Sequence, residues 1–332
     1  MACRAQASSP EVSPLDGIHA SLVTPFTHGG AVDTASLERL ARHCLDGGAA
    51  GLVALGTTGE PAMLTPEEQG TVLRVCREVS AEYGVPLTVG TGGIGTEISV
   101  RQAKECAEIA DVLLVVVPYY LRPSDEGVRV HFAAIGAAVD VPLIPYNIPY
   151  RTGRTPRPET LLGLLAEDYV IGLKHCPGTI DVDTLTLLAG AGPDAAILCG
   201  DDAYLYPMLQ LGAAGGITAS ATIAPAAFAA MAAAVRTGDA ATARTLHERL
   251  LPVVNALFAE PSPSVLKAAL AELGLIDAPL VRSPLCPPAR EPVARALAHL
   301  AALGASGRDA SALGASGLGG GTGGSGGAGG VR

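Results

Sequence analysis

Lysine is scarce in this 332-residue sequence. Only Lys104, Lys174 and Lys267 are lysines, and the other 19 of the 22 basic residues are arginines. No long basic run occurs, and 32 acidic residues give the chain a formal net charge of −10 at pH 7. Because a nucleic-acid surface requires a basic footprint, we expect no nucleic-acid partner.

Long apolar segments are also absent. No stretch approaches the roughly 20 apolar residues that a membrane-spanning helix needs, and the longest candidate, residues 224–235, is mostly alanine. The first ten residues, MACRAQASSP, lack the apolar core of a signal peptide. We therefore expect a cytoplasmic protein that has no membrane partner.

Patterns typical of metal sites and disulfide frameworks are missing as well. The seven cysteines are scattered without a C-x-x-C pair, and the seven histidines show no H-E-x-x-H or other ligand spacing. We expect no metal ion. Cys176 and Cys199 each follow an apolar run, so we predict that both are buried free thiols.

Glycine and proline are abundant, with 41 and 25 residues, but they are unevenly distributed. Many of the glycines lie in residues 305–332, which we predict to be a disordered Gly-rich tail. Residues 1–15 are expected to form a flexible N-terminus. The whole chain is 48% hydrophobic and 16% charged, which is far from a disordered composition.

Eight short apolar runs divide the remaining sequence. Each has four to eight residues and ends in glycine, proline or polar residues, as expected of parallel strands that are buried on both faces. The runs lie at residues 18–25, 51–56, 86–92, 112–118, 142–147, 170–175, 195–201 and 215–220.

Helix signals occupy the segments between these runs. Thr65 to Glu68 supplies a capping residue, a proline at the first helical position and acidic residues in the first turn. Residues 33–46 place apolar side chains at a helical period. Eight strands that alternate with helices predict an α/β fold, a (β/α)8 TIM barrel over residues 16–237.

An open doubly wound sheet is the alternative fold. Its nucleotide-binding pattern, G-x-G-x-x-G, occurs at Gly90, Gly92 and Gly95, but it follows the third run rather than the first. We therefore interpret these glycines as a tight turn at the end of a strand.

Four helical stretches follow the eighth run, at 224–236, 239–259, 262–273 and 289–303. We expect the first to complete the barrel. The other three predict a C-terminal helical domain over residues 238–304.

The active site of such a barrel lies at the carboxyl ends of its strands, where Lys174 ends the sixth run. Burial disfavours an ammonium group and produces a neutral amine, a nucleophile for a carbonyl carbon. The alternative is a lysine at the mouth of the barrel, whose aliphatic portion packs against the protein while its ammonium group forms a salt bridge in contact with water. The next acidic residue along the chain is Asp181, which slightly favours the chemical role. Lys104 and Lys267 lie in predicted helices, and we expect both side chains to be solvated.

Other candidate residues follow neighbouring runs. Tyr146 is suited to transfer a proton, or it is a rim tyrosine whose hydroxyl group contacts water. Thr57 and Thr58 lie in a turn bracketed by glycines, which either binds a carboxylate or is an ordinary turn. Arg151 either binds a carboxylate through its planar guanidinium group or is simply solvated.

Together these residues resemble the pyruvate-dependent class I aldolase family, which includes dihydrodipicolinate synthase and N-acetylneuraminate lyase. The similarity extends from about Ile18 beyond Pro263, and R-T-G at 151–153 is the feature most associated with dihydrodipicolinate synthase. The motifs are GTTGE (56–60), PYY (118–120), YNIPYRTG (146–153), GLK (172–174), GDD (200–202) and FAEPSPSVLKAAL (258–270).

The resemblance implies catalytic roles for four residues. Lys174 would form a Schiff base with pyruvate. Tyr146 would relay protons through Thr57, and Tyr120 of a neighbouring subunit would complete the relay. It also implies a homo-oligomer, either a dimer or a tetramer, and no cofactor beyond the covalent Schiff base.

The resemblance further implies the substrates. Pyruvate would condense with L-aspartate 4-semialdehyde to give 4-hydroxy-tetrahydrodipicolinate, in lysine and diaminopimelate biosynthesis. The substrate-binding residues would be Thr58, Gly200, the backbone carbonyl of Ile217, and Arg151 for the carboxylate of the aldehyde.

Two other functions stay open. His175-Cys176-Pro177 replaces the acidic residue and small polar stretch usual after the lysine, so a related aldolase or dehydratase acting on a sugar acid or another aldehyde is one alternative. Because side chains alternate in direction along a strand, we expect His175 to point away from Lys174. The change at this position should therefore adjust the reactivity of the Lys174 amine rather than abolish it. Tyr150 precedes Arg151 at a position where the family commonly has a small residue, so we expect it to narrow the entrance of the site. A non-catalytic keto-acid-binding barrel is the other alternative, although such a protein needs no nucleophile.

We predict that lysine does not inhibit this protein. Family members that lysine inhibits use serine and histidine side chains around the helix after GTTGE, whereas this chain has Pro61, Pro66 and Gln69 there. Activity of the purified protein measured with and without millimolar lysine should be equal. Appreciable inhibition would contradict the prediction.

Overall fold

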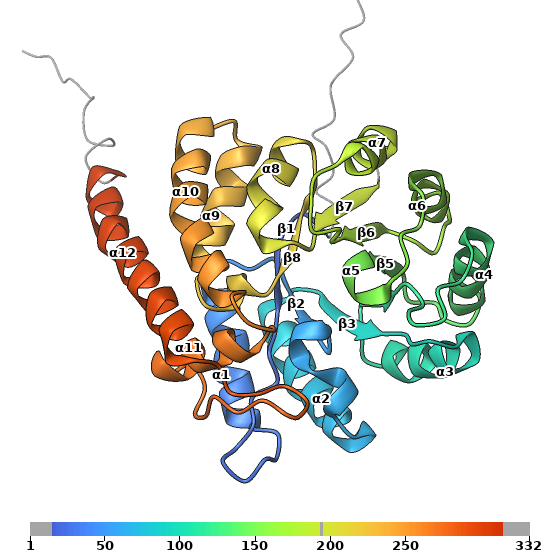
Figure 1. Ribbon diagram of the computed structural model, residues 1–332, viewed down its shortest axis with the longest axis horizontal. Helices are drawn as coiled ribbons and strands as arrows, with labels where there is room; N and C mark the ends of the chain where they lie inside the picture. The colour runs from blue at the N-terminus through green and yellow to red at the C-terminus, as the bar shows by residue number, and fades with distance from the viewer. Residues whose placement is uncertain (1–14, 193–194, 315–332) are drawn as a thin grey trace, which may run out of the picture.

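The computed structural model describes residues 15–192 and 195–314. Its strands form one closed parallel barrel in sequential order, with helices around the outside (Figure 1). The predicted TIM barrel is confirmed, and the open sheet is wrong. The strands are β1 Gly17–Ser21, β2 Gly51–Ala54, β3 Leu87–Thr91, β4 Val112–Val116, β5 Leu143–Asn147, β6 Gly172–His175, β7 Ala196–Cys199 and β8 Gly215–Thr218.

Helices follow every strand and cover the barrel, and short helices occupy several loops after the strands. The outer helices are α1 Thr34–Asp46, α2 Pro66–Tyr83, α3 Thr96–Ala107, α4 Asp125–Gly136, α6 Pro158–Leu165, α7 Val182–Gly190, α8 Leu205–Gln210 and α9 Pro225–Arg236. The short helices are α5 Pro149–Thr152 and the 3-10 turns η1 Thr57–Gly59, η2 Pro61–Met63, η3 Asp202–Tyr204 and η4 Ser220–Thr222.

Local sequence explains where the first two outer helices begin. The Asp33 side chain accepts a hydrogen bond from the backbone N–H of Ser36 and caps α1. Thr65 and Glu68 form the reciprocal capping box of α2, so the predicted helix start is confirmed. These caps satisfy backbone groups that would otherwise lack partners at a helix end.

Closure of the barrel requires glycine at the contact between β1 and β8. A Cβ atom at Gly215 would lie 2.0 Å from the carbonyl oxygen of Gly17, so no larger residue fits there without a backbone shift. Of the three glycines that we predicted as a tight turn, Gly90 lies within β3, whereas Gly92, with φ 96°, and Gly95 follow the strand. At Gly215 and Gly92 the backbone approaches or turns where a side chain would obstruct it.

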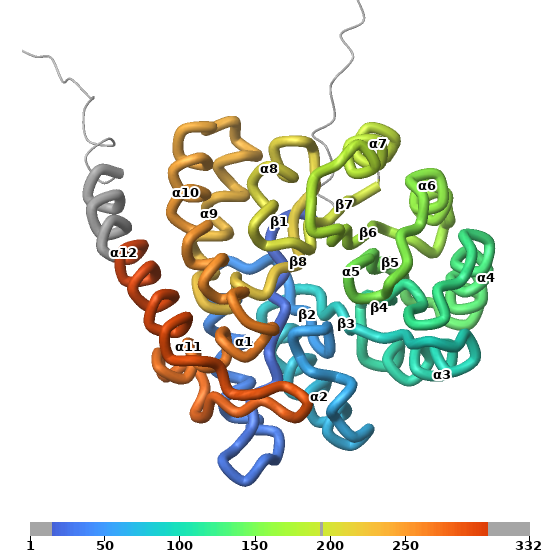
Figure 2. Tube along the Cα trace, viewed as in Figure 1, coloured from blue at the N-terminus to red at the C-terminus, as the bar shows by residue number. Residues whose placement is uncertain are grey.

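Three further helices lie against one side of the barrel (Figure 2): α10 Ala240–Leu257, α11 Ser264–Glu272 and α12 Arg290–Gly314. Helix α10 packs between α9 and α12. The backbone of α12 continues into the range that we predicted as a tail, and residues 1–14 and 315–332 lie outside the described part of the chain. No helix among the described residues is long and apolar enough to cross a membrane.

Lys267 corrects an expectation, because we took this lysine of α11 to be solvated. Its side chain is fully buried, and Nζ donates hydrogen bonds to Oε1 of Glu60 (2.7 Å) and to the carbonyl of Thr24 (2.8 Å). The ammonium group also lies 4.0 Å from the ring centroid of Phe26. The expectation failed because α11 packs back onto the loops after β1 and β2, which are far away in sequence.

Replacing Lys267 with alanine is expected to destabilise the protein by about 3–5 kcal/mol, because Glu60 would remain buried without its cation. Lys104→Ala is the matched control, since Lys104 is exposed on α3 and its loss should change stability by no more than about 0.5 kcal/mol. Urea denaturation of both variants measures the difference. Equal effects would show that the buried pair is not stabilising the fold.

Candidate active site

Lys174 lies at the carboxyl end of β6, and only 6% of its surface is exposed. Within the described chain, no hydrogen bond or ion pair engages its amine. Burial lowers the pKa of Lys174 below its ordinary value, although the nearby Cys176 and Asp202 oppose this effect. The neutral, nucleophilic fraction of the amine is therefore larger at any given pH than that of an ordinary lysine.

Tyr146 is the register partner of Lys174 across the β5–β6 ladder. The Lys174 Nζ atom lies 4.3 Å from the centroid of the Tyr146 ring. Burial raises the pKa of the phenol well above its usual value, whereas a hydrogen bond with the Thr57 side chain acts in the opposite direction. Tyr146 therefore stays protonated at neutral pH and can act as a proton donor.

The turn after β2 brings the two threonines to the same end of the barrel. Thr57 and Thr58 begin the 3-10 turn η1, and Ser21 Oγ donates a hydrogen bond to Thr58 Oγ1 (3.3 Å). Thr58 is buried, whereas Thr57 is exposed and reaches Tyr146. The structure thus brings Lys174, Tyr146 and Thr57 together at the carboxyl end of the barrel.

Gly200, after β7, gives the Lys174 side chain its space. A Cβ atom at position 200 would lie 2.8 Å from Cε of Lys174 and 2.8 Å from Cβ of Cys176. Because both contacts are shorter than real Cβ atoms tolerate, the position suits glycine alone. Ile217 is buried in β8 and packs in the same apolar cluster as Tyr146 and Cys176, so it also faces this interior.

Asp202 is a buried carboxylate of the site for which we predicted no separate role from the sequence. It accepts hydrogen bonds from the backbone N–H groups of Ser220 (2.6 Å) and Ala219 (3.4 Å). Burial raises the pKa of Asp202, although these hydrogen bonds and the charge of Lys174 oppose the increase. The G-D-D motif after β7 was the available signal, but its contact with the loop after β8 was not evident from sequence.

Tyr150 and Arg151 lie on the short helix α5, at the rim. The Arg151 guanidinium lies 5.5 Å from the Tyr150 ring centroid, and no ion pair of the described chain engages it. The Tyr150 hydroxyl lies 3.8 Å from Sγ of Cys176, which donates a hydrogen bond to Oδ1 of Asp201 (2.9 Å). The Tyr150 side chain thus lies beside both the Arg151 guanidinium and Cys176, the residue that follows β6.

The thiols agree with the sequence prediction. Cys176 and Cys199 are both buried and free. Burial raises the pKa of each thiol well above its ordinary value, so both stay protonated at neutral pH. Within the described residues, no group of three or more His, Cys, Asp and Glu side chains is arranged to hold a metal ion.

Tyr120 is not part of this cluster within the single chain. It lies in the loop between β4 and α4, is 79% exposed and has a left-handed φ of 65°. Within the described chain, no hydrogen bond joins Tyr120 to Tyr146 or Thr57. The predicted proton relay is therefore incomplete in one chain.

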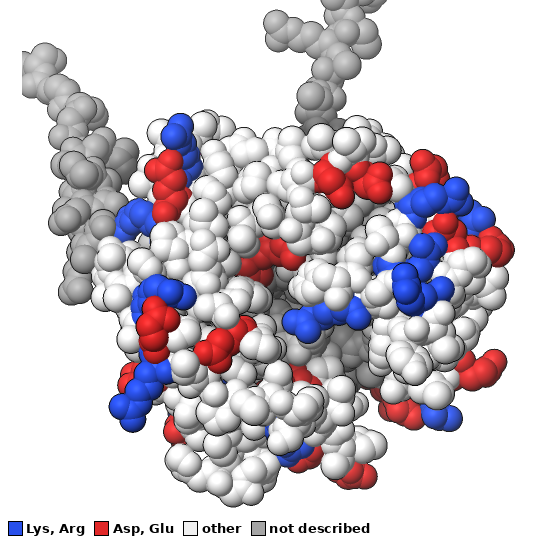
Figure 3. Space-filling model, in the orientation of Figure 1, with Lys and Arg blue, Asp and Glu red and all other residues white. Residues whose placement is uncertain are grey.

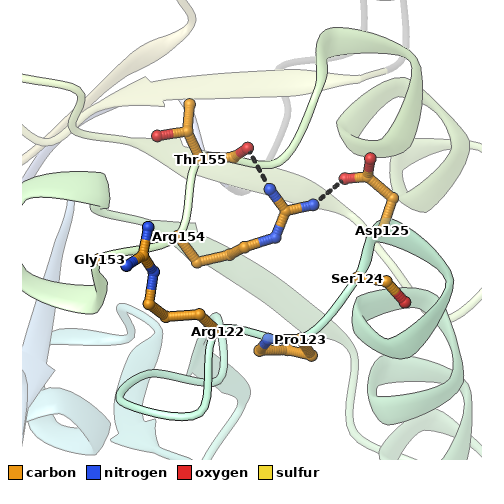
Figure 4. Close-up of a pocket in the computed structure, with 7 residues that line it drawn as sticks. All are labelled: Arg122, Pro123, Ser124, Asp125, Gly153, Arg154 and Thr155. Carbon is orange, nitrogen blue, oxygen red and sulfur yellow. Dashed lines mark hydrogen bonds and ion pairs between the residues drawn. The ribbon is translucent and has the colours of Figure 1, made fainter.

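An open pocket of about 730 Å³ lies beside the Tyr120 loop (Figure 4). Its single carboxylate, Asp125, forms ion pairs with Arg154 and with the neighbouring Arg157. In Figure 3, acidic side chains lie within the central hollow of this face and basic side chains lie at its edge. The residues that line the pocket are Arg122, Pro123, Ser124, Asp125, Gly153, Arg154 and Thr155.

Comparisons with known proteins agree with this geometry. A model of the dihydrodipicolinate synthetase family matches residues 14–302. A protein of Synechococcus sp. (strain WH7803) named 4-hydroxy-tetrahydrodipicolinate synthase is 40% identical over 287 residues, which cover 86% of this chain and 93% of that relative. A relative of the same name from Thermomicrobium roseum is 40% identical over 289 residues, covering 87% and 94%.

Solved structures give the same result. The crystal structure of dihydrodipicolinate synthase from Thermotoga maritima superposes with a TM-score of 0.84 at 32% identity, covering 89% of this chain and 99% of that one. A structure described as the first monomeric dihydrodipicolinate synthase variant superposes with a TM-score of 0.83 at 32% identity, covering 86% and 96%.

The lowered pKa of Lys174 predicts that its amine becomes reactive at a lower pH than an ordinary lysine. A lowered pKa increases the neutral fraction at every pH below 10.5, so labelling should rise earlier along the pH scale. Brief labelling with an amine-reactive reagent between pH 6 and 11, followed by peptide mass spectrometry, measures the midpoint for Lys174. A midpoint at or above 10.5 would contradict the prediction.

Proposed function

The chain belongs to the dihydrodipicolinate synthetase family, and we propose that it condenses pyruvate with L-aspartate 4-semialdehyde to form 4-hydroxy-tetrahydrodipicolinate. It is a lyase of the class I aldolase type. The observation that carries the proposal is the buried amine of Lys174 beside the phenol of Tyr146 at the carboxyl end of the barrel. The relatives named above extend over most of the same chain.

The first step joins pyruvate to Lys174. The neutral amine attacks the keto carbon of pyruvate, and a proton moves from nitrogen to the new alkoxide to give a carbinolamine. Tyr146 then donates its proton to the departing hydroxyl group, so that water leaves, and a protonated imine and the Tyr146 phenolate remain. Thr57, which is hydrogen-bonded to Tyr146, stabilises this phenolate and connects it to the rest of the proton relay.

The second step forms the new carbon–carbon bond. The Tyr146 phenolate takes a proton from the pyruvate methyl group of the protonated imine, which gives an enamine. The enamine carbon attacks the aldehyde carbon of aspartate semialdehyde. The aldehyde oxygen takes up a proton through the same relay. The amino group of the acceptor then attacks the imine carbon, displaces the Lys174 amine and closes the ring.

Substrate recognition is assigned to residues around these reacting atoms. Thr58, Gly200 and the backbone carbonyl of Ile217 hold the pyruvate portion. Arg151 receives the carboxylate of the aldehyde, because its planar fork matches a carboxylate and no ion pair of the described chain occupies it. No cofactor takes part in this scheme.

Tyr120 is assigned to the active site of a neighbouring subunit in a homodimer or homotetramer. Its exposure and left-handed backbone support this assignment, because a bulky residue in that conformation costs free energy that a functional contact can offset. The enzyme is further proposed to act in the cytoplasm, in lysine and diaminopimelate biosynthesis. The relatives do not favour the sugar-acid alternative.

The proposal is tested with purified protein, pyruvate and aspartate semialdehyde, by following the cyclic product with mass spectrometry. Lys174→Ala should abolish product, and Tyr146→Phe should lower kcat by about 10²–10⁴-fold, the range for loss of a general acid. Arg151→Gln should raise KM for the aldehyde more than KM for pyruvate. Lys104→Ala should behave as the wild type.

Two outcomes would overturn the proposed function. Absence of product with the wild-type protein would exclude the synthase reaction. Product formation by Lys174→Ala at the wild-type rate would exclude Lys174 as the nucleophile.

A further inference from the structure

The rung of the β5–β6 ladder that follows Lys174 and Tyr146 consists of two buried polar residues. Asn147 and His175 are register partners, and they are 2% and 4% exposed. His175 points away from the Lys174 side chain and packs toward helix α7, as strand alternation predicted. The Tyr146–Lys174 pair is therefore directly followed by the Asn147–His175 pair, whose side chains face the outer helices.

A chain of side-chain hydrogen bonds runs from this rung to the start of α7. His175 Nδ1 lies 3.2 Å from Nδ2 of Asn147, and its Nε2 lies 3.1 Å from Oγ1 of Thr184. Thr184 Oγ1 lies 3.0 Å from Oδ1 of Asp181, which also caps the helix by accepting from the backbone N–H of Thr184 (2.9 Å). The chain thus links β5, β6 and α7.

Asp181 fixes the direction of every bond in this chain. Hydrogen bonds from Thr184 lower the pKa of Asp181, so it is an ionised carboxylate that can only accept. The Thr184 hydroxyl therefore donates to Asp181 and accepts from Nε2–H of His175. The Nδ1 atom of His175 is left as an acceptor, and the Asn147 amide donates to it.

This arrangement requires a neutral histidine, and its environment provides one. Burial lowers the pKa of His175 to about 4, although the charge of Asp181 acts in the opposite direction. Protonated imidazole has two donors and no acceptor, which would leave the Asn147 amide facing another donor. At neutral pH the side-chain hydrogen bonds Asn147–His175, His175–Thr184 and Thr184–Asp181 can therefore all form at the same time.

We propose that His175 is a positioning residue, which holds the ends of β5 and β6 so that the Lys174 amine and the Tyr146 phenol meet in reactive geometry. The inference rests on the proposed function of these two residues. Beyond this rung β5 turns into α5, and a backbone hydrogen bond from Cys176 N to Asn147 O (2.9 Å) continues the strand contact. The hydrogen-bonded side chains from Asn147 to Asp181 add a connection to the outer helices at the place where the β5–β6 ladder ends.

Two substitutions separate the hydrogen bonds from the packing. His175→Leu retains an apolar volume but removes both ring bonds. His175→Gln retains a carbonyl oxygen that can accept from Asn147 and an amide that can donate to Thr184. Thr184→Val removes the hydroxyl in the middle of the chain at nearly constant shape.

Two residues elsewhere provide matched controls. His131 is also buried, with a pKa that burial lowers to about 4, and it bonds to Thr96 between α4 and α3. His131→Gln therefore disturbs a similar buried histidine away from the site. Thr186→Val removes another hydroxyl of α7, which donates to the Val182 carbonyl on an exposed face.

The test measures urea stability, kcat, and the rate at which borohydride traps pyruvate on Lys174, at a temperature where each variant is folded. His175→Leu and Thr184→Val should each lower kcat and the trapping rate at least tenfold. His175→Gln should keep both rates within about threefold of the wild type. His131→Gln and Thr186→Val should keep wild-type rates, whatever their stability.

The outcomes distinguish this inference from the proposed function. If the wild-type protein traps no pyruvate, the proposed function fails. If the wild type traps pyruvate and Thr184→Val does so at the same rate, the positioning role is overturned while the proposed function stands. Thr184→Val decides the matter even if His175→Leu does not fold. A loss of rate in His131→Gln equal to that in His175→Leu would likewise overturn the positioning role.

Discussion

Removal of the Lys174 amine from water is the constraint on which the rest of the site depends. Closed parallel strands leave little solvent around a side chain at their carboxyl ends, and desolvation has the largest effect on the pKa of this amine. A carboxylate in contact would offset that effect. Asp202, which is near enough to act on the amine, instead accepts hydrogen bonds from the backbone of Ala219 and Ser220.

A second buried lysine, unlike Lys174, has its charge neutralised by a buried carboxylate. Lys267 has lost its water too, but it is paired with Glu60, and it therefore acts in packing rather than in chemistry. Glu60 directly follows the turn that carries Thr57 and Thr58. The C-terminal helices thus hold one wall of the candidate site, and the molecule does not divide simply into a catalytic barrel and a passive appendage.

Sequence patterns predicted the features that depend on neighbouring residues. Apolar runs and caps such as Thr65 identified the barrel, and the end of the sixth run singled out Lys174. The patterns failed at Lys267, because its partner Glu60 lies 207 residues away and no local signal links them. Strand alternation predicted the direction of the His175 side chain, but no local pattern indicated its hydrogen-bond partner Thr184, which lies on α7.

The central claim is that the Lys174 amine is the nucleophile for a keto acid. Incubating the protein with pyruvate, reducing with borohydride and mapping the modified peptide by mass spectrometry tests that claim most directly. We expect one reduced pyruvate adduct per chain, located on Lys174, with Lys104 and Lys267 unmodified. No adduct, or an adduct on another lysine while Lys174 stays free, would contradict it.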